Sequence, residues 1–225
     1  MANQVFVVGA DGTLEHTIIN AFTANGDSVY HLKMTDELDT DTLVQQLERH
    51  QPNVVILCPT WLERGNFLTS STAQWMDALE HNVETPVYIL KTLINYVYGG
   101  GKMDAVINLS HVAASTPLRG LSALGTTLSA THVLLKMAAL ELASYGVRAN
   151  SVMLGPQLDR LVISKETMQR LEQDTPVQQD SLEAAAITCM MLTSPVGKYL
   201  TGQVLDVSGG FLLTRAKETS PFAAT

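Results

Sequence analysis

The sequence predicts an α/β fold in which helices cover both faces of a parallel sheet. Short runs rich in valine and isoleucine alternate with longer segments of helical period along the chain. Several of these runs, such as VFVV and VVIL, are apolar throughout, as expected for strands that are buried on both faces. The first run leads through the turn GADG straight into a helical segment. We therefore expect a single-domain, doubly wound parallel sheet of six or seven strands.

The strands are predicted from the short apolar runs, which are enriched in β-branched residues. A weak seventh strand is placed near Glu37–Leu38, where the pattern is less regular. The six clear strands are expected at Gln4–Val8, Ser28–Leu32, Asn53–Leu57, Ala105–Leu109, Arg148–Leu154 and Gln203–Val207.

Helices are predicted between the strands, because apolar residues recur there at three- and four-residue spacing. Pro86 is expected to disturb the third helix locally, since proline lacks the backbone N–H of a regular helix. Residues 1–216 are assigned to the single domain and residues 217–225 to a flexible tail. The helices are expected at Thr13–Ala24, Thr40–His50, Thr72–Tyr98, Ser122–Ser144, Lys165–Gln173 and Ser181–Leu192.

Composition argues against several classes of partner. A net charge of -8 and a pI near 5.1 disfavour binding to nucleic acid or to anionic lipid. Hydrophobic residues make up 46% of the chain, yet we expect no segment to approach the roughly 18 to 20 uncharged apolar residues of a membrane helix. With no basic leader before the first apolar run, a cytoplasmic protein is expected. Cys58 and Cys189 are predicted to be buried free thiols in a reducing compartment.

Two blocks in the second half, MAALELASYGVRANSVMLGP and YLTGQVLDVSGG, resemble the C-terminal half of the short-chain dehydrogenases/reductases. The resemblance extends to the first strand and its turn, to PNVVILC and DAVINLS, and to the helical EHNVETPVYIL. It implies a Rossmann-type fold, NAD(P) binding and oxidoreductase activity. One stretch departs from the family pattern: residues 33–52 are too few to form the helix and strand that the family has at this point.

The resemblance makes the turn after the first strand the candidate cofactor site, with Gly9 and Gly12 as its contacts. Glu15 takes the place of the family's third glycine. If its carboxylate points inward it competes with a pyrophosphate for the helix dipole, whereas if it faces water it does not. Trp61 stands where the family has a small residue, and either fills the adenosine or ribose space or packs at the surface. Asp39 is either an adenine contact or a helix N-cap. We expect NAD(P) binding to be weak and predict no cofactor.

The resemblance also indicates where the family's catalytic residues would stand. Counting back from Glu141 places the tyrosine position on Leu124 and the lysine position on Leu128. The serine position falls on His111, and only Asn82 of the four survives. Leucine cannot transfer a proton, so these four positions are interpreted as a vestigial catalytic site.

Other chemistry has weaker support. His111 is either a replacement acid or base or a polar residue that caps a strand end. Ser110 lacks the Gly-x-Ser-x-Gly context of a hydrolase nucleophile. The remaining histidines show no metal-ligand spacing, so no metal is predicted.

The leading functional hypothesis is a non-catalytic subunit that pairs with an active short-chain dehydrogenase through the long helices at residues 72–98 and 122–144. Heteromeric members with one inactive subunit exist in this family, such as the benzylsuccinate-pathway hydroxyacyl-CoA dehydrogenase, which the chain resembles. An oligomer is expected. Two alternatives stay open: a module that senses a nucleotide or other ligand, and an atypical oxidoreductase that uses His111 and Asn82.

Overall fold

The computed structural model describes residues 2–34, 40–59, 63–155, 169, 173, 175–177 and 181–214. Several predicted features lie outside these residues. They are the weak strand near Glu37–Leu38, the side chains of Asp39 and Trp61, nearly all of the helix at Lys165–Gln173, and the tail at residues 217–225.

The centre of the fold is a parallel sheet of six strands, which confirms the predicted fold class. The strand order is β2-β1-β3-β4-β5-β6, and every neighbouring pair is parallel. Each predicted strand agrees with the structure to within two residues at either end. The strands are β1 Gln4–Gly9, β2 Ser28–Lys33, β3 Val54–Leu57, β4 Ala105–His111, β5 Arg148–Leu154 and β6 Val204–Val207.

The helices follow the predicted segments, with one change in the longest. The segment at residues 72–98 contains a π-helical turn at Glu80–Glu84, immediately before Pro86 in the first turn of α4. The local disturbance expected from this proline is therefore present. The α-helices are α1 Thr13–Ala24, α2 Thr40–His50, α3 Thr72–Leu79, α4 Thr85–Tyr98, α5 Ser122–Leu142, α7 Ser181–Thr193 and α8 Phe211–Thr214. Short 3-10 helices occur at Val112–Ala114, Ala143–Tyr145 and Pro195–Tyr199.

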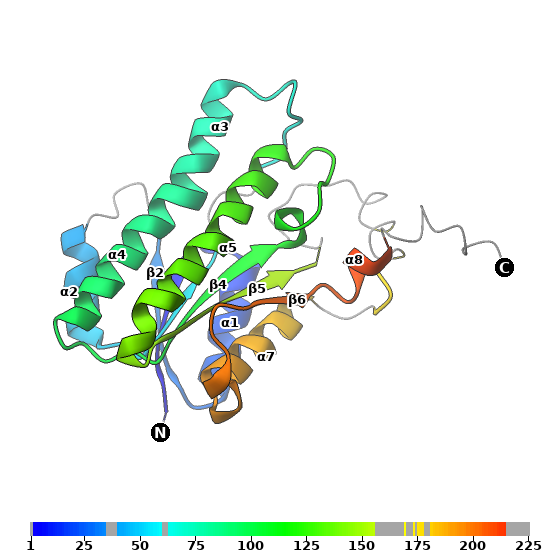
Figure 1. The fold of residues 1–225 in the computed structure, drawn as a ribbon. Helices are drawn as coiled ribbons and strands as arrows, with labels where there is room; N and C mark the ends of the chain where they lie inside the picture. Colours follow the sequence, from blue (N-terminus) through cyan, green and yellow to red (C-terminus); the bar gives the residue numbers. More distant parts are fainter. Residues whose placement is uncertain are drawn as a thin grey trace.

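Helices cover both faces of the sheet (Figure 1). Side chains alternate along each strand, so Val5 and Val7 of β1 join a core with α1 and α7, whereas Phe6 and Val8 join a core with α2, α4 and α5. The inner strands β1, β3, β4 and β5 are almost entirely buried because both of their faces are covered, whereas β2 and β6 at the edges are partly exposed. This explains why β1 and β3 appear in the sequence as continuous apolar runs.

The strand order reverses at β1. From β1 the chain first adds β2 on one side, and then crosses to place β3 on the other side. In open α/β sheets, ligands bind outside the carboxyl ends of the strands at such a switch point. The residues just after β1 and β3 are therefore the candidate functional site.

One helical segment, Ser122–Tyr145, is long and apolar enough to cross a membrane by length and composition. It carries Lys136 and Glu141, so it is not a run of uncharged apolar residues of the kind expected for a membrane helix. In the described part of the chain, 56% of the most apolar window of this segment is buried inside the fold. The segment contains α5, whose inner face packs on the sheet as a core helix does.

Candidate functional site

The turn between β1 and α1 is filled by the side chain of Glu15. This side chain is 0% exposed, so the alternative that it faces water does not hold. Its Oε2 accepts a hydrogen bond from the backbone N–H of Gly12 at 3.1 Å. A Cβ atom added to Gly9 would lie 2.8 Å from Glu15 Oε1 and 2.7 Å from Cys58 Cβ. The carboxylate thus lies directly against Gly9, at the carboxyl end of β1.

The local sequence explains this orientation. Gly12 is the N-cap of α1, with an extended backbone, and Glu15 is the third residue of the helix. A glutamate at this position can reach back to the N–H of the N-cap residue, as in a capping box. Its negative charge is also favourable beside the positive end of the helix dipole.

These residues do not fit the pyrophosphate of a dinucleotide cofactor. In this fold a pyrophosphate requires free N–H groups at the start of the helix, and Glu15 already binds that of Gly12. Two like charges about 4 Å apart repel by roughly 4 kcal/mol at an effective dielectric of 20. The glycine turn of a dinucleotide site is therefore present at Gly9 and Gly12, but the Glu15 carboxylate lies where the pyrophosphate would bind.

The rim of the same turn carries a small group of charged and titratable side chains. Asp11 forms an ion pair with Lys33 at 2.6 Å, and His16 Nε2 lies 3.1 Å from the same carboxylate. The hydrogen bond and charge of Lys33 hold the pKa of Asp11 below its usual value. His31 Nε2 lies 2.7 Å from the backbone oxygen of Ala10, which places His31 beside the turn.

The two leucines at the family's tyrosine and lysine positions are core residues. Leu124 is 0% exposed and Leu128 is 2% exposed. Both belong to the apolar core formed on one face of the sheet with Ala78 and Ala123. No proton donor can act from either of these positions.

A small cavity lies at the carboxyl ends of β1, β3 and β4. Its lining includes Cys58, Asn82, Leu128 and Thr131. Its volume is about 20 Å³, which is enough for about one water molecule.

Asn82 connects the π-helical turn to α5. It is 2% exposed, and its Nδ2 donates to Thr127 Oγ1 at 3.1 Å. A second amide, Asn108 on β4, donates to Thr131 Oγ1 at 3.4 Å. Both bonds end on the buried face of α5, so they fix this helix against the sheet and the π-helical turn.

His111 lies at the end of β4 and is 0% exposed. Its Nδ1 accepts a hydrogen bond from the backbone N–H of Ala113 at 3.1 Å, which caps the 3-10 helix Val112–Ala114. The side chain therefore holds the local backbone, and as placed it is out of reach of a substrate.

Sequence reasoning missed a buried pair between β4 and α5. His132 Nε2 lies 2.8 Å from Ser110 Oγ, and both residues are buried. The sequence contains a signal for this contact, because His132 follows Leu124 and Leu128 at four-residue intervals on one face of the helix. Ser110 is 0% exposed, so this pair joins two core elements and cannot act on a substrate.

Acid should destabilise the protein through His132. Burial, with a contribution from Lys136, holds the pKa of His132 below 6.5. Below pH 6.5 the unfolded chain therefore binds a proton that the folded chain does not, and stability falls until the pH passes the folded pKa. The slope from this residue is at most about 1.4 kcal/mol per pH unit. Chemical denaturation between pH 8 and 5 should show that the free energy of unfolding falls less steeply with decreasing pH in the His132→Gln variant than in the unmodified protein. Equal slopes would contradict this assignment.

Two further expectations concern cysteines and metals. Cys58 and Cys189 are both buried thiols outside any disulfide bond, as predicted. Burial raises the pKa of Cys189 to about 12, so its thiol is inert near neutral pH. Within the described ranges, no group of three or more histidine, cysteine, aspartate or glutamate side chains could hold a metal ion.

The parallel sheet, its switch point and the glycine turn that leads into α1 define a Rossmann-type domain. A family model described as enoyl-(acyl carrier protein) reductase matches residues 3–212. The chain therefore belongs to the short-chain dehydrogenase/reductase family.

Individual relatives agree with this family. An uncharacterized oxidoreductase of Mycobacterium tuberculosis is 32% identical over 152 residues, which are 65% of this chain and 57% of that protein. Pteridine reductase 1 of Leishmania tarentolae is 29% identical over 147 residues, 62% of this chain and 51% of that protein. The chain thus spans little more than half the length of these relatives. A short-chain dehydrogenase of Leptospira borgpetersenii, solved with bound NAD+, has the same fold, with a TM-score of 0.81, 16% identity and coverage of 94% of this chain and 93% of that one.

Proposed function

We propose that the chain is a non-catalytic subunit of a hetero-oligomeric short-chain dehydrogenase/reductase, in which a second, active subunit performs the hydride transfer. The observation that carries this proposal is the burial of Leu124 and Leu128 in the core. General acid-base groups contribute about 10²- to 10⁴-fold to a reaction rate, and neither leucine can supply one. The family fold without these two catalytic groups supports a role in assembly or regulation.

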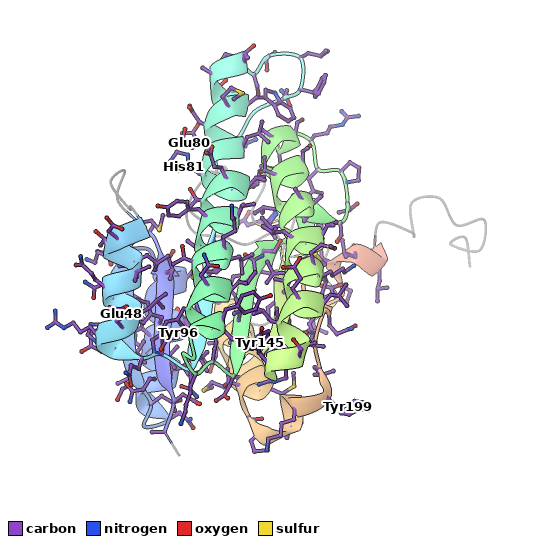
Figure 2. All side chains as sticks on the ribbon, turned by 60° about the vertical axis from the view of Figure 1, so that its left-hand side comes forward. Glu48, Glu80, His81, Tyr96, Tyr145 and Tyr199 are labelled. Atoms are coloured by element: carbon purple, nitrogen blue, oxygen red, sulfur yellow. The ribbon has the colours of Figure 1, made fainter. Side chains whose placement is uncertain are left out.

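The surface proposed for the active partner is formed by α3, α4 and α5, whose helices lie side by side (Figure 2). Three apolar side chains project from α5 at four- and three-residue spacing: Val133, Met137 and Leu140 are 61%, 50% and 72% exposed. An apolar row on a helix surface is typical of an interaction site. Other exposed apolar residues of these elements are Met76, Leu79, Tyr98 and Tyr145.

The end of this surface is reinforced by aromatic packing. The rings of Tyr98, at the end of α4, and Tyr145, after α5, lie 4.7 Å apart between centroids. Both side chains are about half exposed. This contact between tilted rings joins the end of α4 to the segment after α5. A short-chain dehydrogenase with matching long helices is the partner that we propose, in an NAD-dependent assembly of the hydroxyacyl-CoA type known from the benzylsuccinate pathway.

The test is co-expression with the short-chain dehydrogenases encoded by neighbouring genes, followed by purification and assay of each protein alone and together. We expect a stable complex that oxidises or reduces its substrate, whereas this chain alone does not. Replacing the partner's catalytic tyrosine by phenylalanine should abolish turnover by the complex. The proposal would be contradicted if none of these dehydrogenases bound this chain and each was as active without it as with it.

The same assay also tests the alternative that this chain is itself an atypical oxidoreductase that uses His111 and Asn82. Turnover by this chain alone, lost in the His111→Ala variant, would support that alternative. The burial of His111 and its bond to Ala113 favour a structural role instead.

A further inference from the structure

We infer that the Glu15 carboxylate is a built-in substitute for a phosphate anion, and that it closes a dinucleotide site whose backbone frame is still present. This inference goes beyond the proposed function, because it concerns ligand binding and is independent of whether the chain has a proton donor. The ligand class is a nucleotide with a pyrophosphate group.

The position of the carboxylate supports a substitute anion. α1 has twelve residues, and Glu15 Oε2 accepts the N–H of its N-cap residue, Gly12. Anions bind at helix N-termini through these N–H groups and through the helix dipole. A side chain that is 0% exposed at this point excludes an external anion, because two anions would share one set of donors.

The frame around the carboxylate is held by the sheet and not by Glu15. The N–H of Met34 donates to the oxygen of Gly9 at 2.8 Å, and the N–H of Cys58 donates to the oxygen of Val8 at 2.8 Å. Both bonds continue the parallel pairing of β1 with its two neighbours. Shortening the glutamate side chain should therefore leave the turn in place.

The space released would lie directly above Gly9. Glu15 Cγ and Oε1 would lie 3.2 and 2.8 Å from a Cβ atom at Gly9, so the side chain fills the volume that this glycine leaves open. Close approach of backbone to a pyrophosphate is the reason for glycine at such a turn. Lys33 stands at the rim beside Asp11, so its ammonium group is placed near the space that a phosphate would enter once the buried carboxylate is gone.

The experiment is a calorimetric titration of NAD+, NADH, NADP+ and NADPH into the full chain and three variants. The unmodified protein should give no binding heat at millimolar ligand. Glu15→Gly should bind at least one of the four nucleotides at least tenfold more tightly. Glu15→Gln keeps the volume and removes the charge, so it should gain less than Glu15→Gly.

Glu48→Gln is the matched control, since it changes the net charge by the same amount at an exposed position on α2, outside this turn. It should not gain binding. Glu15→Ser is a second small variant for use if glycine impairs folding, which thermal unfolding detects. Binding by the unmodified protein would overturn the inference and support the nucleotide-sensing alternative. A folded Glu15→Gly or Glu15→Ser variant that binds none of the four nucleotides would also overturn the inference. Both of these outcomes leave the test of the non-catalytic subunit unaffected, because that test measures complex formation and turnover.

Discussion

Replacing Leu124 by alanine should lower the free energy of unfolding by about 2–5 kcal/mol. The side chain is 0% exposed and packs in the core beneath α5, so its removal loses apolar burial and leaves a cavity. Urea denaturation of the purified chain measures the change. Shortening a residue that lined an open active site would instead change the free energy of unfolding only slightly.

Leu213→Ala is the control for this measurement. Leu213 lies on α8, is 73% exposed and undergoes the same chemical change, so its effect should stay within about 0.5 kcal/mol. A small effect at Leu124, similar to that at Leu213, would show that the family's tyrosine position is not core and would contradict the central observation of the proposed function.

Introducing glutamate at both Val133 and Leu140 should weaken the complex with an active subunit at least a hundredfold. Both side chains are exposed on α5, so the isolated chain should remain as stable as before. In a complex, however, two carboxylates would be buried against an apolar surface, and burying unpaired charge is costly. Size-exclusion chromatography with light scattering measures assembly, and interferometry measures the dissociation constant.

Tyr199→Glu is a suitable control for this double variant. Tyr199 is fully exposed and lies outside the surface formed by α3, α4 and α5, as Figure 2 shows. Its substitution should leave assembly unchanged. If the Val133 and Leu140 double variant assembled normally, the proposed partner surface would be wrong and the partner would have to bind another face of the molecule.

The fold was largely predictable because it follows from periodicity. Strands buried on both faces give continuous apolar runs, and amphipathic helices give a period near 3.6. The π-helical turn at Glu80–Glu84 was predictable only as a disturbance, since a proline signals a break without indicating the extra residue per turn. Sequence pattern identifies the element, whereas packing decides its geometry.

The site was predictable only in part. Burial of Leu124 and Leu128 agrees with their spacing on one helix face. The direction of Glu15 was undetermined, because a glutamate in the first turn of a helix is favourable both in water and as a cap. Only the tertiary position of Cys58 next to Gly9 encloses it. The spacing of His132 from Leu124 and Leu128 places it on the inner face of α5. Its partner Ser110 was not predictable, because the partner depends on the register of α5 on β4.

The bond between Glu15 and Gly12 has a thermodynamic consequence. A diffusible ligand that binds only the native state stabilises it in proportion to the logarithm of its concentration, so a cofactor-dependent protein weakens when the cofactor becomes scarce. A covalently tethered carboxylate acts at a constant local concentration. Under the inference that Glu15 excludes nucleotides, the stability of the folded state is expected not to change with the supply of nicotinamide nucleotides, and a partner that relied on it would have a scaffold of constant strength.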